Sequence, residues 1–251
     1  MNKRKIEICL FILVFYLGLI IKLVLWNNTG YISRDSALYL GYIEQWYNAS
    51  WSNNYAFMNE VRQPPLFFYL AQLLMHFNLS PLYASLTINF FWGSTIPIIG
   101  YLLAKKIGKN CLFAFITMLV LLFHPSLNKL SIEAQRDIGY IAMLSIGIYL
   151  LLKAITENNL FCVCLAGLFG GLSLLLRIEG IELLPLAGVL FFVRKKNLSD
   201  FCKKIMLFQV SMIVVFICTA KLMGLQYKDI SRMFFSRYDI LMEESMTTGT
   251  Y

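Results

Sequence analysis

Long apolar runs alternate with short polar segments along the whole chain. The runs that we predict to cross a membrane cover residues 6–26, 82–104, 111–124, 138–153, 160–176, 181–193 and 205–223. A bilayer core of about 30 Å requires roughly 20 apolar residues per helix, so the shorter runs require tilted helices or a thinned bilayer. The pattern predicts an all-α polytopic membrane protein with about seven transmembrane helices, forming a single membrane domain over residues 1–251.

The polar segment 27–79 contains two further helical patterns. Apolar and aromatic residues recur at helical spacing near its start, at Leu38, Tyr39, Tyr42, Ile43 and Trp46. Residues 64–77 are apolar but too short to span a bilayer, and they open with Pro64 and Pro65, which a helix start tolerates. We predict that both patterns form interfacial helices on the extracytoplasmic surface.

Composition excludes most soluble classes. The chain is 59% hydrophobic and 14% charged, with a mean hydropathy of +0.66, whereas soluble domains carry about 25% charged residues. The six cysteines lie within apolar runs or at their basic ends, so no disulfide framework is indicated. We predict that Cys162 and Cys164 pack within the membrane and do not form a metal site.

The charge distribution predicts an orientation. Basic clusters at residues 3–5, 105–109, 194–196 and 203–204 flank apolar runs, which is typical of cytoplasmic loops. With the N-terminus cytoplasmic, the inner side receives 12 basic and 3 acidic residues, and the outer side, including the tail 224–251, receives 10 and 11. The net charge of +8 is therefore a topology signal and indicates no nucleic-acid partner. The absence of obvious organellar targeting favours a bacterial plasma membrane.

An acidic residue opens the first predicted interfacial helix. Ser33 is placed to cap this helix, and Asp35 lies in its first turn, where the helix dipole favours a carboxylate. One interpretation of Asp35 is therefore helix capping. The other is a general base or metal ligand held at the membrane surface.

Other charged residues gather at span ends on the same predicted face, namely Arg62, Arg136, Asp137, Arg177 and Glu179. Arg62 either pairs with Glu60 or lipid phosphate, or binds substrate. Arg177 and Glu179 occupy a tight turn, where charges are also common without function. Arg136 and Asp137 sit directly at a span start, where ionisable groups are more often functional, and guanidinium forks suit phosphate.

Familiar hydrolase motifs are missing from the sequence. It contains no P-loop, GxSxG, HExxH or dinucleotide fingerprint, which argues against nucleotide hydrolysis and against serine or zinc hydrolase chemistry. His124, one of two histidines, supports neither a metal site nor a base.

The order of these segments resembles the GT-C class of polyprenyl-phosphate-dependent glycosyltransferases, especially protein O-mannosyltransferases and the lipid A aminoarabinose transferase. The resemblance rests on residues 34–40, on 62–69 with the paired prolines, on 101–106, on Arg136-Asp137, and on 176–180 followed by Leu184-Pro185. It covers nearly the whole chain, and the specific signal is the ordered set rather than any one motif.

The resemblance implies transfer of one hexosyl or pentosyl group, with inversion, from a polyprenyl-phosphate carrier to a hydroxyl of a lipid, glycan or protein acceptor. It implies that Asp35 is catalytic, with a divalent metal (Mg, Mn or Zn) beside it, and that the donor phosphate meets Arg62, Arg136 and Arg177, supported by Asp137, Glu179 and Tyr39. Three features depart from the family: Ser36 replaces a second acidic residue, Gln63 separates Arg62 from Pro64, and the chain is short, which predicts a truncated form.

Two other functions remain open from the sequence. A truncated member without activity would serve as a membrane scaffold or subunit. A transporter of a lipid-linked substrate would require polar residues at mid-span and interrupted helices in repeated halves. We expect few ionisable residues at span centres, which favours chemistry at the surface.

Overall fold

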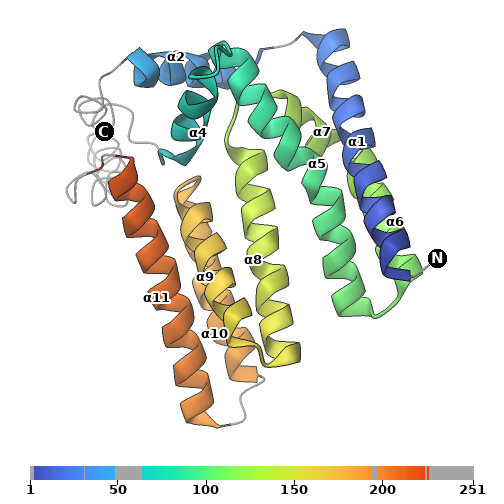
Figure 1. Cartoon of the computed structure of the whole chain (residues 1–251), viewed down its shortest axis with the longest axis vertical. Helices are drawn as coiled ribbons and strands as arrows, with labels where there is room; N and C mark the ends of the chain where they lie inside the picture. Colours follow the sequence, from blue (N-terminus) through green and yellow to red (C-terminus); the bar gives the residue numbers. More distant parts are fainter. Residues whose placement is uncertain (1–2, 31, 49–63, 194–196, 224, 226–251) are drawn as a thin grey trace, which may run out of the picture.

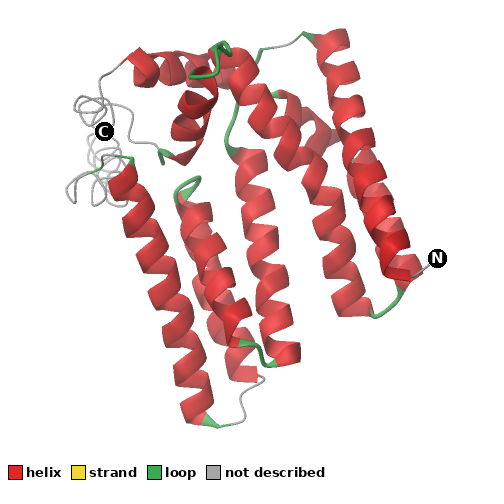
Figure 2. Ribbon diagram, in the orientation of Figure 1, coloured by secondary structure: helices red, strands yellow, loops and turns green. Residues whose placement is uncertain are grey.

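The computed structural model describes residues 3–30, 32–48, 64–193, 197–223 and 225. Its helices are α1 (Lys3–Thr29), α2 (Arg34–Asn48), α4 (Leu66–Met75), α5 (Pro81–Gly108), α6 (Cys111–Phe123), α7 (Pro125–Ile132), α8 (Asp137–Glu157), α9 (Leu160–Leu174), the 3-10 helix η1 (Ile178–Glu182), α10 (Leu183–Val193) and α11 (Leu198–Leu222). Helices and loops make up all of this described part, without a strand (Figure 2). The all-α prediction is confirmed.

The long helices run in alternating directions, and α2 lies across one end of them (Figure 1). We call the end with α2 and α4 the α2 end, and the opposite end, where α5 finishes and α11 begins, the basic end. Lys105 and Lys106 lie in the last turn of α5, at the basic end. The starts of α2 and α8 and the turn before α10 share the α2 end (Figure 1). The segments that we predicted to lie on one outer face therefore lie together.

Four helices are long and apolar enough to cross a membrane, namely α1, α5, α8 and α11. The pair α6 and α7, bent by 49°, would make a fifth span. The protein is thus a multi-pass membrane protein. The count of seven spans stays a prediction, because α9 and α10 are helices of 15 and 11 residues.

Short polar side chains cap several of these helices. The side-chain oxygen of Asn110 accepts the N–H of Leu112 at 2.8 Å at the start of α6, and Asn159 accepts that of Phe161 at 2.9 Å at the start of α9. Such caps satisfy N–H groups that the first turn leaves without partners. They allow the chain to reverse in a few residues between antiparallel helices.

A helix that we did not predict follows the third run. Pro125 ends α6 because it cannot continue the backbone hydrogen bonding, and it opens α7 instead. The Nδ1 atom of His124 accepts the N–H of Leu127 at 3.4 Å and caps α7. His124 therefore stabilises the start of α7.

The helices α2 and α4 pack on each other and on the bundle. Phe67, Phe68 and Ala71 of α4 are buried in the main hydrophobic core. Trp46 of α2 is fully buried, and its Nε1 donates to Oε1 of Gln72 on α4 at 2.8 Å. The aromatic residues of the α2 pattern thus fix this helix across the end of the bundle.

Candidate functional site

The segment 133–137, which links α7 to α8, is held by a side chain from α5. Asn89 is fully buried, and its Nδ2 donates to the carbonyl oxygens of Glu133 at 2.5 Å and Gln135 at 2.7 Å. One amide group therefore fixes two backbone carbonyls that precede Arg136. Because buried carbonyls require partners, this contact defines the path of the segment.

Two serines of α2 hold the same segment from the other side. The hydroxyl of Ser36 accepts the N–H of Ala134 at 3.1 Å, and Nε2 of Gln135 donates to the hydroxyl of Ser33 at 3.3 Å. Ser33 also accepts the N–H of Ser36 at 3.1 Å, which confirms it as the cap of α2. Asp35 is consequently not needed as the cap, and it is exposed in the first turn.

Two of the three guanidinium nitrogens of Arg136 lack a hydrogen-bond partner among the described residues. These two atoms, Nε and Nη1, are buried. The guanidinium lies 5.8 Å from the ring centroid of Tyr39, which stacks on Phe68 at 5.7 Å. Burial lowers the pKa of Arg136, while Tyr39 raises it. A buried charge without a partner is unfavourable, so this geometry suits an anionic ligand.

Arg177 is the opposite case. Its Nη1 donates to Oδ1 of Asp137, and its Nη2 and Nε donate to the two carboxylate oxygens of Glu179 at 3.1 and 3.3 Å. Its guanidinium also lies 5.6 Å from the ring centroid of Tyr140. The hydrogen bonds that Arg177 donates to Glu179 raise the pKa of Arg177, and the charge of Asp137 acts in the same direction. Two carboxylates thus neutralise this arginine.

A close approach of backbone shapes the turn that carries Arg177. A Cβ at Gly180 would lie 2.5 Å from the backbone nitrogen of Leu174, so only glycine fits there. The N–H of Gly180 donates to the carbonyl of Arg177 at 2.9 Å. The turn therefore returns tightly against the end of α9 and leaves Arg177 directed toward α8.

Electrostatic effects show that the charged residues are neighbours. Burial raises the pKa of Tyr39 and the charge of Arg136 lowers it, with smaller effects from Asp137, Arg177 and Asp35. The site thus unites residues from α2, from the start of α8 and from the turn after α9.

Glu133 is a further residue of this site, which we did not predict from the sequence. This residue is 7% exposed, and burial raises the pKa of its carboxyl, with Lys129 lowering it and Asp137 and Asp35 raising it further. Lys129 Nζ lies 4.0 Å from Glu133 Oε1. The only sequence signal was its place three residues before Arg136.

Six of the predicted site residues come together at the α2 end, namely Asp35, Tyr39, Arg136, Asp137, Arg177 and Glu179. Arg62 lies outside the described residues. Across the described ranges, no group of three or more His, Cys, Asp or Glu side chains could hold a metal ion. Asp35 as a metal ligand stays a prediction.

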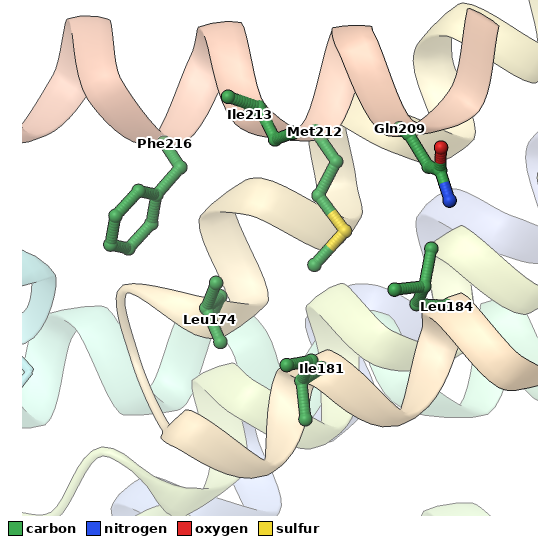
Figure 3. A pocket seen from close by; sticks show the side chains of 7 residues that line it. All are labelled: Leu174, Ile181, Leu184, Gln209, Met212, Ile213 and Phe216. Carbon is green, nitrogen blue, oxygen red and sulfur yellow. The ribbon is translucent and has the colours of Figure 1, made fainter. Parts of the chain in front are cut away.

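An apolar cavity of about 430 Å³ lies between α9, α10 and α11 near the Arg177 turn (Figure 3). Its lining consists of Leu174, Ile181, Leu184, Gln209, Met212, Ile213 and Phe216. Leu174 and Ile181 flank Arg177 in the sequence, so the cavity adjoins the turn that carries this residue. Such a lining suits a hydrocarbon chain.

Comparison with known families decides the relationship. Residues 62–223 match the family described as dolichyl-phosphate-mannose-protein mannosyltransferase. The chain belongs to this family. The match begins before α4, ends at the close of α11, and includes Arg136 and Arg177, while Asp35 precedes it. No curated protein matches the chain. Membership of the mannosyltransferase family places the protein among membrane glycosyltransferases.

Proposed function

We propose that this protein transfers a sugar from a polyprenyl-phosphate carrier to an acceptor hydroxyl, with inversion, at the α2 end of the bundle. The acceptor is a lipid, a glycan or a protein, and the α2 end faces the extracytoplasmic side of a bacterial plasma membrane. The observation that carries this proposal is that the buried Nε and Nη1 atoms of Arg136 lack a hydrogen-bond partner in the described part of the chain. In a glycosyltransferase family, a phosphate-linked donor supplies the missing anion.

Arg136 is better suited to the donor phosphate than Arg177. Nε and Nη1 of Arg136 have no acceptor among the described residues, whereas all three side-chain nitrogens of Arg177 donate to carboxylates. A guanidinium binds phosphate through paired N–H donors. Arg177 then orders the start of α8 through Asp137, and Arg62 is a second candidate for the phosphate.

Asp35 is proposed as the general base. It accepts the proton of the acceptor hydroxyl while that oxygen forms a bond to the anomeric carbon. The bond from the anomeric carbon to the phosphate oxygen breaks, and its electron pair leaves on the polyprenyl phosphate. Arg136 stabilises the negative charge that develops there. Attack from the face opposite the phosphate inverts the anomeric centre.

The apolar cavity supports a donor with an isoprenoid tail. Its lining is aliphatic or aromatic except for Gln209 and Met212 (Figure 3). Apolar contacts of this kind hold a hydrocarbon chain beside the turn of Arg177, within the depth of the membrane helices. The phosphate then remains at the α2 end.

We also propose that Asp35 would supply one ligand to a divalent cation (Mg, Mn or Zn) bound at this end. A single carboxylate, with no cluster of three such ligands in the described ranges, is a poor fit to a resident ion. No step of the mechanism above passes through a metal.

Transfer can be measured in membranes of cells that express the full chain and are supplied with radiolabelled polyprenyl-phosphate mannose. We expect Asp35→Asn to lower transfer by about 100-fold or more, since a general base contributes about 10²–10⁴ in rate. Glu44→Gln is the matched control, because Glu44 is the other carboxylate of α2 and is exposed.

Two results would count against the proposal. Equal transfer by wild type and Asp35→Asn would remove Asp35 as the base. Absence of transfer by wild type, with this donor and other polyprenyl-phosphate sugars supplied, would favour the scaffold or subunit role.

A further inference from the structure

Lys22 is a charged residue buried within the first membrane helix. Its side chain is 1% exposed, and it is the one charged residue between Ile8 and Trp26 of α1. It lies four residues before the end of the predicted first span, residues 6–26, and not at its centre. Intramembrane ionisable residues are costly and are commonly retained for function.

The ammonium group of Lys22 has only uncharged partners. Nζ donates to the carbonyl of Gly18 at 3.3 Å and to Oδ1 of Asn128 on α7 at 3.4 Å. No carboxylate of the described residues lies within ion-pair distance of it. Its link to another helix is therefore the contact with Asn128.

Small residues make room for the lysine where three helices meet. A Cβ at Gly93 of α5 would lie 2.6 Å from Cε of Lys22 and 2.1 Å from the hydroxyl oxygen of Ser131 on α7. A Cβ at Gly18 would be 3.1 Å from the hydroxyl oxygen of Ser94. The side chain of Lys22 is thus packed between α1, α5 and α7 without spare volume.

Asn128 links Lys22 to the bend between α6 and α7 through hydrogen bonds. Its Oδ1 accepts from Lys22, and its Nδ2 donates to the carbonyl of Leu122 at 3.0 Å. The break at Pro125 leaves carbonyl groups of the last turn of α6 without helical partners, and Asn128 satisfies one of them. α7 then leads directly into the segment 133–137.

We propose that Lys22 is a positioning residue for Arg136. By holding Asn128, it fixes α7 against α1, and α7 sets the start of the segment 133–137. Hydrogen bonds from or to Asn89, Ser33 and Ser36 also hold this segment. The effect on sugar transfer rests on the proposed function. The effect on the geometry of the segment does not, and it can be measured separately.

The measurement uses the full chain in native membranes, with its cysteines replaced and a single new cysteine at Ala134, which is 2% exposed. We expect Lys22→Met to raise the rate of alkylation of this cysteine by a hydrophilic maleimide at least tenfold. Lys221→Met, the same change at an exposed lysine of α11, leaves the rate unchanged.

A cysteine at Ala71 of α4, also fully buried, distinguishes a local effect from general loosening. Its alkylation rate stays at the wild-type level in Lys22→Met. The proposal is overturned if the cysteine at 134 keeps its wild-type rate, or if both cysteines accelerate together. Should Lys22→Met fail to accumulate, Gly93→Ala displaces the ammonium sterically and is judged by the same criterion.

Transfer kinetics supply the second readout. Displacement of Arg136 raises the KM for the polyprenyl-phosphate sugar at least fivefold at an equal amount of folded protein, with a smaller change in kcat. If wild type transfers no sugar, the proposed function fails while the alkylation result still decides the role of Lys22.

Discussion

Arg136 and Arg177 lie at the same end of the bundle, yet they differ in their hydrogen-bond partners. Each guanidinium lies over a tyrosine ring, at 5.8 Å for Arg136 and 5.6 Å for Arg177. Arg177 is held by Asp137 and Glu179, whereas buried nitrogens of Arg136 lack partners among the described residues. The aromatic contact alone therefore does not distinguish a structural arginine from a binding one. The hydrogen bonds to carboxylates do, since Asp137 and Glu179 lie near both arginines but accept hydrogen bonds from Arg177.

The two arginines also differ in how their backbones are fixed. The segment before Arg136 is clamped by side chains from α2 and α5, which are far from it in sequence. Arg177 sits on a tight turn that is closed by its own neighbours, including Gly180. Distant helices thus determine the position of Arg136, as is required of a group that must meet a ligand precisely.

The largest expected difference between Arg136 and Arg177 is in the rate of sugar transfer. We expect Arg136→Gln to lower the rate of sugar transfer by about 100-fold or more, because it removes the stabilisation of charge on the departing phosphate. Its melting temperature in detergent does not fall, since the buried Nε and Nη1 atoms that are lost have no hydrogen-bond partner among the described residues. Lys129→Gln, which removes an exposed positive charge from α7, is the control. If Arg136→Gln keeps more than a third of the wild-type activity, the proposed difference in role between Arg136 and Arg177 is wrong.

The second effect is on stability and belongs to Arg177. We expect Arg177→Gln to lower the free energy of unfolding by about 1–2 kcal/mol, at the lower end for charged hydrogen bonds because the group is partly exposed. The change leaves Asp137 facing Glu179 without a cation, so adding Glu179→Gln recovers part of the loss. Thermal unfolding of the purified protein measures both variants. An Arg177→Gln protein as stable as wild type would show that the pairing is not structural.

The smallest effect concerns Glu133. Because burial raises the pKa of its carboxyl in the folded protein, the folded state binds the proton more tightly than the unfolded state. Stability from this group is therefore full at low pH and is lost as the pH rises through the folded pKa. Glu133→Gln is expected to be more stable than wild type at pH 7 and equal to it below the ordinary glutamate pKa of about 4.3. A stability difference that does not change with pH would contradict this.

Most of the helices could be predicted from the sequence, because membrane helices consist of long apolar runs. Each predicted span coincides with a helix, and Pro64 and Pro65 lie directly before α4 as expected. The helix α7 was missed because residues 125–132 are too polar and too short to stand out. A cap at His124 and a contact with Lys22 stabilise it, and neither is visible from local propensity.

The candidate site could be predicted as a set of residues but not as a set of roles. The topology placed Asp35, Arg136 and Arg177 on one face, and the structure brings them together. Which arginine is free depends on the side-chain partners of each, and these come from different helices. Lys22 was overlooked, although a lone lysine in an apolar run is itself a signal.

The most direct test is the affinity of the purified full chain, in lipid nanodiscs, for a polyprenyl monophosphate. We predict that Arg136→Gln raises the Kd at least tenfold, that Arg177→Gln changes it less than threefold, and that the uncharged polyprenol binds wild type and both variants alike. An unchanged Kd in Arg136→Gln, or a larger loss in Arg177→Gln, would contradict the assignment of the donor phosphate to Arg136.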